Sequence, residues 1–150
     1  MGKKTVIFLF LLLIIPVILY FLWPSDESRI KRLFREGADA IEQEDLGRVM
    51  EKVSFNYRDD YGLTYLSVRE GMEKIFQRMT DIRVEYENLD IVLKDKTATA
   101  EMDVRVIAAI GNDTGYIVGD LPNPVRMRFT LEKERTKWLV TGTGGLPLWW

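Results

Sequence analysis

The chain has 150 residues, and its 21 Lys and Arg residues against 23 Asp and Glu residues give a formal net charge of −2 at pH 7. This length fits one globular domain with one further segment, and the mild acidity gives no electrostatic reason to expect a nucleic-acid partner. The sequence contains neither Cys nor His, which excludes disulfides, thiolate metal sites and the usual proton shuttle at neutral pH.

The amino-terminal part is an apolar run from Thr5 to Trp23 without a charged residue. As a helix it would extend about 28 Å, close to the roughly 30 Å hydrocarbon core of a bilayer. Tyr20 and Trp23 fit an interfacial aromatic belt, and the two lysines before the run favour a cytoplasmic amino end. We therefore predict that residues 1–24 form a cytoplasmic tip and transmembrane signal anchor, with the remainder on the periplasmic or extracellular side of the membrane.

A cleaved signal peptide is the alternative for this segment. The apolar core of a signal peptide usually has about 7–15 residues and is followed by small residues at the cleavage site. The run found here is longer, and residues 20–24 read Tyr-Phe-Leu-Trp-Pro without a pattern of small residues. These two features favour an uncleaved, single-pass anchor.

Residues 25–150 are predicted to form one soluble domain that starts with helices. Apolar residues at helical spacing predict a helix from the Ser25 cap to about Glu44 and a short helix around residues 46–53. Ser67 and Glu70 form a capping box for a third helix. The intervening residues, 54–64, break the helical rhythm and indicate a short extended piece with a turn.

From Asp81 onward the apolar residues recur at every second position, which predicts strands. A change of parity between Tyr86 and Leu89 predicts a bulge or bend. The other predicted strands cover residues 97–110, 125–132 and 138–143, and residues 111–124 are predicted to be a loop with room for a hairpin around residues 116–118. Helices followed by an antiparallel meander indicate an α+β fold with the helices on one face of the sheet.

Four short stretches of the domain carry a resemblance to a known superfamily. They are Tyr57-Arg58-Asp59-Asp60-Tyr61-Gly62, Lys96-Thr97-Ala98-Thr99-Ala100, Phe129-Thr130-Leu131-Glu132-Lys133 and Trp138-Leu139-Val140. With the order of helices and strands, they resemble the NTF2-like (nuclear transport factor 2-like, SnoaL-like) superfamily over about Ser25 to Leu146. The resemblance implies a cone-shaped domain of three helices on a bent, mostly antiparallel sheet, which often dimerises through the open sheet face. Members of the superfamily include isomerases, dehydratases and non-enzymatic binding domains.

The mouth of such a cone would lie near residues 57–65, where two interpretations of the aromatic side chains stay open. They could line a cavity for an apolar or aromatic ligand, or they could belong to the core. With Asp60 added, the candidate ligand-binding residues are Tyr57, Asp60, Tyr61, Tyr65 and Tyr86.

The same segment offers the one candidate for catalysis. Asp60 in an apolar pocket could act as a general acid or base, with Tyr57 or Tyr86 donating a hydrogen bond to a developing oxyanion. Alternatively, Asp59 and Asp60 are turn residues that cap backbone amides. No spaced acidic series supports a metal site, and we expect neither a metal nor a cofactor.

On the other face of the predicted sheet lie charged residues that are either solvated or paired across a homodimer. They are Asp103, Arg105, Arg126 and Arg128. Trp149 and Trp150 are expected to contact the membrane interface or a partner, or to cover an edge of the core. The function that these features favour is a non-catalytic, membrane-tethered domain that binds an envelope protein or a small apolar ligand. The alternative is a cofactor-free acid–base enzyme.

Overall fold

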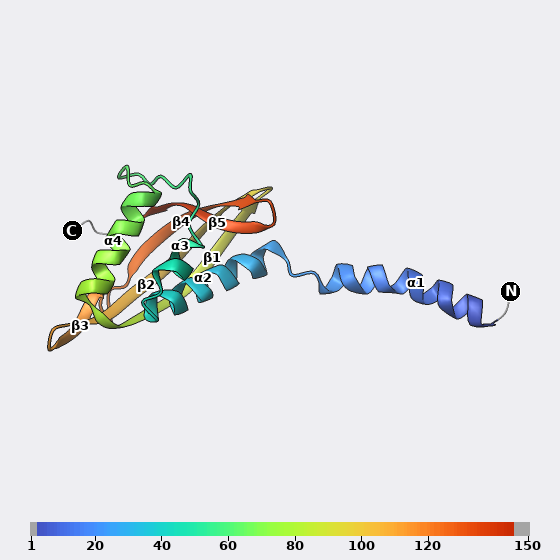
Figure 1. Ribbon diagram of the computed structural model, residues 1–150, viewed down its shortest axis with the longest axis horizontal. Coiled ribbons are helices and arrows are strands. Elements are labelled where there is room, and N and C mark those ends of the chain that lie inside the picture. Colours follow the sequence, from blue (N-terminus) through green and yellow to red (C-terminus); the bar gives the residue numbers. More distant parts are fainter. Residues whose placement is uncertain (1–2, 146–150) are drawn as a thin grey trace.

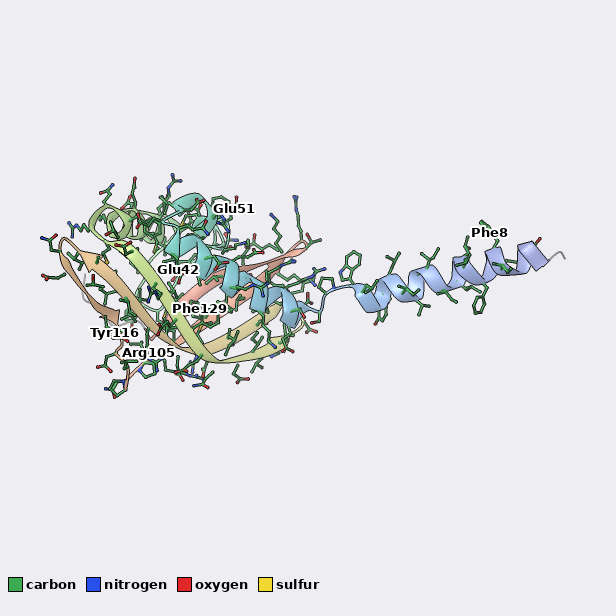
Figure 2. The ribbon with its side chains drawn as sticks, turned by 90° about the horizontal axis from the view of Figure 1, so that it is seen from below. Phe8, Glu42, Glu51, Arg105, Tyr116 and Phe129 are labelled. Carbon is green, nitrogen blue, oxygen red and sulfur yellow. The ribbon has the colours of Figure 1, made fainter. Side chains whose placement is uncertain are left out.

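The computed structural model describes residues 3–145, and in it one long helix extends away from the folded remainder of the chain (Figure 1). This helix, α1 (Lys3–Leu22), includes Pro16. Its large apolar side chains, such as Phe8, are exposed around the helix (Figure 2). Within the described residues, no helix combines the length and the hydropathy needed to cross a membrane. The proposed contacts of Trp149 and Trp150 lie outside the described residues.

Two helices follow α1 as the apolar periodicity predicts. Helix α2 (Asp26–Glu42) begins at the N-cap Ser25, whose Oγ accepts a hydrogen bond from the Ser28 amide at 3.2 Å. Helix α3 (Leu46–Met50) begins after Asp45, whose carboxylate accepts from the Arg48 amide at 3.0 Å. Both caps satisfy amides that a helix start otherwise leaves without an acceptor. Helix α2 buries the face formed by Ile30, Leu33, Phe34 and Ala40.

Helix α4 (Tyr65–Arg78) starts earlier than the predicted capping box at Ser67 and Glu70. Its N-cap is Thr64, which has an extended backbone and accepts a hydrogen bond from the Ser67 amide at 3.5 Å. Ser67 is therefore already inside the first turn. No residue of α4 is fully buried, so its apolar face is only partly covered.

Five antiparallel strands form one sheet with the order β1-β2-β4-β5, and β3 pairs with the outer part of β2. The strands are β1 (Thr80–Lys94), β2 (Thr97–Ile110), β3 (Asp113–Val118), β4 (Val125–Glu134) and β5 (Lys137–Gly144). The segment predicted as a loop thus contains a strand, because the hairpin allowed around residues 116–118 does form. Helices α2 and α3 cover one side of the sheet, and α4 lies toward the end that carries β3 (Figure 1).

The predicted irregularity in the first strand is confirmed. The register between β1 and β2 shifts between Glu87 and Asp90, and Asn88 has a positive φ of 54°. A bulge of this kind places an extra residue in one strand and increases the local bend. The side-chain Nδ2 of Asn88 also donates to Asp103 Oδ2 at 2.7 Å, which holds the bulge against β2.

The core lies between α2 and the inward face of the sheet, and its members follow the predicted alternation. Buried residues of α2 meet residues of β2, β4 and β5 in one cluster: Ile30, Leu33, Phe34, Ala98, Ala100, Met102, Val104, Met127, Leu131, Trp138 and Val140. Phe34 and Phe129 meet edge to face with ring centroids 5.1 Å apart, a favoured geometry for aromatic pairs. Side chains therefore occupy the room beside the small Ala98 and Ala100.

The bulge provides a test of the bend in the sheet. Asn is among the few non-glycine residues that tolerate the left-handed region, whereas a β-branched residue there is strained. We expect Asn88→Val to lower the free energy of unfolding by about 1–2 kcal/mol more than Asn88→Gly does. Urea denaturation of the two variants measures this difference, and equal stabilities would show that residue 88 does not keep its positive φ in solution.

Candidate functional site

The segment between α3 and α4, where the sequence placed the mouth of the cone, is attached to the edge strand β5. The Ser54 amide donates to the Val140 carbonyl at 2.9 Å, and the Arg58 amide donates to the Thr141 carbonyl at 3.0 Å. Ser54 is fully buried, and its hydroxyl donates to Glu134. These bonds fix the backbone of the segment on both sides of Tyr57.

Tyr57 is a core residue rather than the lining of an open cavity. Its side chain is 5% exposed and belongs to the main buried cluster. A hydrogen bond of 2.6 Å joins its Oη to Thr143 Oγ1, and its hydroxyl also donates to Asp59 Oδ2 at 3.4 Å. Burial raises the pKa of Tyr57 to about 12, because the charged phenolate is poorly solvated there. Tyr57 is therefore a neutral structural residue at ordinary pH.

The two adjacent aspartates have separate environments. Asp59 accepts hydrogen bonds at Oδ1 from the Tyr61 amide at 2.9 Å and the Leu63 amide at 2.8 Å, and this confirms its interpretation as a turn residue. Asp60 is exposed to solvent. The apolar pocket that the catalytic interpretation of Asp60 requires is therefore not found around this side chain, because the chain turns so that Asp59 faces the backbone amides.

The remaining tyrosines of the predicted set do not converge on one cavity. Tyr61 is exposed, Tyr65 is half-buried against the core with its ring 4.6 Å from that of Phe55, and Tyr86 is half-buried from β1. Neither of the two pockets described next is lined by any of these residues. Ligand binding by Tyr57, Asp60, Tyr61, Tyr65 and Tyr86 stays a prediction.

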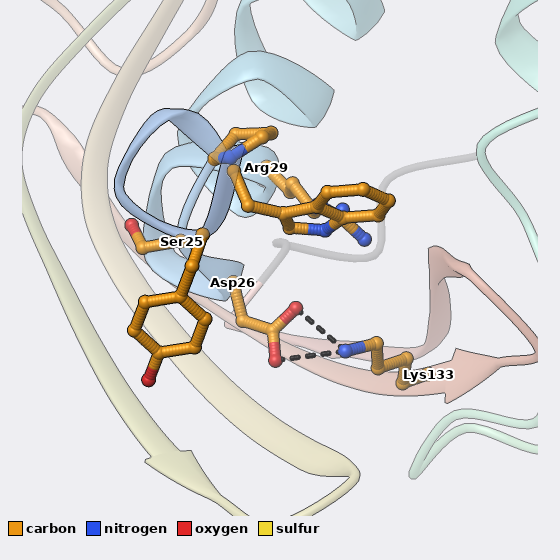
Figure 3. A pocket seen from close by; sticks show the side chains of 7 residues that line it. Ser25, Asp26, Arg29 and Lys133 are labelled. Carbon is orange, nitrogen blue, oxygen red and sulfur yellow. Dashed lines mark hydrogen bonds and ion pairs between the residues drawn. The ribbon is translucent and has the colours of Figure 1, made fainter. Parts of the chain in front are cut away.

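Two pockets lie around the connection between α1 and α2. The first, called the junction pocket, has a volume of about 470 Å³ and is shown in Figure 3. Its lining residues are Tyr20, Trp23, Pro24, Ser25, Asp26, Arg29 and Lys133. The second has a volume of about 390 Å³ and continues along α2 toward the turn between β4 and β5, sharing Pro24 and Arg29 with the first.

Asp26 is the electrostatic centre of the junction pocket. Lys133 Nζ donates to its two carboxylate oxygens at 2.8 and 2.9 Å, and Trp138 Nε1 donates to Oδ1 at 3.0 Å. The hydrogen bond from Lys133, followed by that from Trp138, lowers the pKa of Asp26 below its ordinary value. These bonds connect the first turn of α2 to the β4–β5 hairpin, and Figure 3 shows the two between Asp26 and Lys133.

Arg29, one turn further along α2, faces the same pocket. Its Nη1 donates to the Thr136 carbonyl at 3.2 Å, and its guanidinium carbon lies 5.8 Å from the centre of the Trp23 ring. Its Nε is buried without a hydrogen-bond acceptor. Such a donor is uncommon in folded proteins and calls for an explanation.

The sequence predicts a helix start at the Ser25 cap but does not predict that Asp26, Arg29, Lys133 and Trp138 come together. One signal was present: Lys133 has the same strand parity as Met127 and Leu131, which predicts an inward-facing lysine. A lysine at such a position needs a carboxylate partner. The partner itself could not be identified without the position of α2 on the sheet.

The charged face of the sheet pairs its residues within the chain. Arg126 lies 3.2 Å from Asp103, Arg128 lies 2.7 Å from Glu101, and Arg105 contacts Glu87 at 2.8 Å. These pairs need no second subunit to be satisfied, and the homodimer through this face stays a prediction.

No family model matches the sequence, and no curated protein matches it. Solved structures do match. A candidate scytalone dehydratase from Novosphingobium aromaticivorans has a TM-score of 0.67 at 12% identity, with 82% of this chain and 89% of that chain covered. A candidate aromatic ring hydroxylase from the same organism has a TM-score of 0.67 at 18% identity, with 79% and 85% covered. A protein of unknown function with a cystatin-like fold from Nostoc punctiforme has a TM-score of 0.62 at 16% identity, with 79% and 87% covered.

The chain has an NTF2-like fold. The α+β architecture expected from the resemblance, with helices on an antiparallel sheet, is thereby confirmed. At identities of 12–18% the NTF2-like fold is what these structures share with the chain, and a shared fold does not carry an activity with it.

The environment of Tyr57 predicts an unusual titration. Tyr57 should ionise near pH 12, and Tyr57→Phe should remove that late step from an absorbance titration at alkaline pH. Because the raised pKa means that the folded state holds the proton more tightly, this contribution to stability is complete below about pH 10 and declines as the pH rises toward 12. A late step that persists in Tyr57→Phe would contradict the assignment.

The two aspartates should respond differently to the same substitution. Asp59→Ala removes the acceptor of two backbone amides, and we expect it to lower the free energy of unfolding by about 1–3 kcal/mol. Asp60→Ala is its matched control, with an expected change within about 0.5 kcal/mol because the side chain is exposed. Chemical denaturation of both variants checks the order, and a larger loss for Asp60→Ala would contradict it.

Proposed function

We propose that this chain is a membrane-tethered, non-catalytic NTF2-like domain that binds a partner protein or a small apolar ligand on the exported side of a membrane. The observation that carries the proposal is the exposure of apolar side chains along α1, from Ile7 to Leu22. Large exposed apolar surfaces mark contacts with a membrane or another protein. The two lysines at the amino end favour a cytoplasmic tip.

Lipid is the environment that would relieve this exposure over the whole helix. Burial of one large apolar side chain is worth roughly 1.5–3 kcal/mol, and many such side chains surround α1. The proposal requires α1 to reside in lipid, and the test below measures that directly.

A binding role is favoured over catalysis by the state of the candidate catalytic residues. Asp60 is exposed to solvent and lies outside any apolar pocket of the kind that the catalytic interpretation requires. The Tyr57 hydroxyl is engaged with Thr143 and Asp59 inside the core. The acid–base alternative therefore lacks the buried pair that it was built on.

The partner is proposed to bind at a mouth patch, which we define as Phe55, Tyr61, Tyr65 and Leu66. Phe55 is 81% exposed, Leu66 is 65% exposed, and Tyr61 is 48% exposed. Exposed aromatic and large apolar side chains gathered in one segment are typical of interface anchors. Tyr61 and Tyr65 are the two members of the predicted ligand-binding set that belong to this patch.

Alkaline carbonate extraction tests the tether. The full chain should stay in the membrane pellet, and the double variant Leu12→Arg and Ile15→Arg should be released, since each central arginine costs about 2.5–3.5 kcal/mol of insertion free energy. Val92→Arg, at an exposed position of β1, is the matched control and should stay in the pellet. Release of the unmodified chain, or a mature form that begins near Ser25, would contradict the proposal.

A further inference from the structure

Positive charge gathers at the end of the domain from which α1 leaves. The two pockets there are lined by five basic and three acidic side chains, although the whole chain has a formal net charge of −2. The basic residues are Arg29, Arg32, Lys52, Lys133 and Lys137, and the acidic residues are Asp26, Glu36 and Glu51. The lining of these pockets therefore has a net positive charge, which attracts anions.

Most of this positive charge is already neutralised within the chain. Lys133 is bound to both oxygens of Asp26, and Lys52 Nζ lies 2.5 Å from Glu36. Arg29 differs, because in the described part of the chain it forms no ion pair. Its charge helps to lower the pKa of Asp26 without such a contact, so Arg29 is the cation of the junction pocket that can pair directly with an external anion.

The hydrogen bonding of Arg29 also points to a missing acceptor. Nη1 is used by the Thr136 carbonyl, while Nε is buried and has no acceptor. A buried donor left without a partner is destabilising. The planar guanidinium favours oxyanions that accept two parallel hydrogen bonds, phosphates above all. Because Arg29 lines the pocket, an oxyanion there would accept hydrogen bonds from its guanidinium.

The other walls of the pocket suit a lipid rather than a free anion. Tyr20 and Trp23 are highly exposed aromatic residues at the end of α1, where such side chains prefer the headgroup layer of a bilayer. The volume of about 470 Å³ is in the usual range for small-molecule pockets. The same space therefore combines a cationic donor with an amphipathic wall.

We propose that the junction pocket binds the phosphate of an anionic phospholipid headgroup, with Arg29 as its principal ligand. Lys133 supports the site by neutralising Asp26, whose carboxylate would otherwise repel the phosphate. The inference rests on the proposed tether, which brings the pocket to the lipid surface. The pocket would make α1 and the domain contact the same lipid layer.

Native mass spectrometry of the detergent-solubilised full chain tests the site. Titration with phosphatidylglycerol should give bound lipid at lower concentrations than titration with phosphatidylcholine does. Arg29→Gln should weaken phosphatidylglycerol binding about tenfold, the loss expected for one charge-assisted hydrogen-bonded contact. Arg29→Lys keeps the charge without the planar guanidinium, and its affinity for phosphatidylglycerol should lie between those of the unmodified chain and Arg29→Gln. Arg128→Gln, an exposed arginine on the sheet face, is the matched control and should bind as the unmodified chain does.

Three outcomes would overturn the inference. The first is equal binding of the two lipids by the unmodified chain, and the second is binding of phosphatidylglycerol by Arg29→Gln as strong as that by Arg128→Gln. The third is displacement of phosphatidylglycerol by glycerol 1-phosphate at equal concentration, which would reassign the pocket to soluble phosphate esters. If Arg29→Gln does not fold, the lipid preference of the unmodified chain and the glycerol 1-phosphate competition still decide. Carbonate extraction separates the failure of this inference from the failure of the proposed tether. If the chain is released from membranes but still prefers phosphatidylglycerol, only the tether is refuted. If the chain stays anchored but shows no preference, only the lipid site is refuted.

Discussion

The arrangement of this molecule depends on the hydrogen-bonded group of Asp26, Lys133 and Trp138. Residues more than a hundred positions apart in sequence meet there, so the first turn of α2 is held against the hairpin of β4 and β5. With that end held, α2 lies across the sheet and places Ile30 and Phe34 in the core. Because the Asp26 pKa is lowered, this contribution is complete above about pH 4 and is lost as the pH falls through the folded pKa. The same group sets the point from which α1 leaves the domain.

The features that the sequence predicted well are those that depend on local periodicity. Alternation along residues 97–110 and 125–132 identified the inward faces of β2 and β4, since a half-buried strand repeats every two residues. The change of parity near Asn88 identified the bulge. Periodicity was less informative where the structure depends on which side chain caps a particular amide. The hydroxyl of Thr64, rather than that of Ser67, caps the start of α4. Nor could periodicity decide which of two neighbouring aspartates faces the turn. Periodicity could not predict the junction pocket, because contacts between α2 and the hairpin depend on how the helix lies on the sheet.

The interior and the exterior of the cone have different roles in this account. Core side chains, including Tyr57, occupy the interior near the predicted mouth. The contribution of Tyr57 is therefore to stability rather than to catalysis. The chemically uncommitted groups lie outside. At one end is the apolar mouth patch with Phe55 and Leu66, and at the α1 end is Arg29 with its unpaired donor. An NTF2-like fold accommodates many functions, and the function proposed here uses two separate contact surfaces, one toward lipid and one toward a partner.

A double-mutant cycle between Asp26 and Lys133 tests whether their contact holds the start of α2 against the β4–β5 hairpin. Asp26→Asn, Lys133→Gln and the double variant would be made in the full chain, and their free energies of unfolding measured by denaturant titration in detergent. The two side chains are partly buried and joined by two hydrogen bonds, so we expect a favourable coupling of about 1 kcal/mol. The account predicts that the double variant is hardly less stable than either single variant. Fully additive losses would show that these residues act independently and that the start of α2 is not held by this contact.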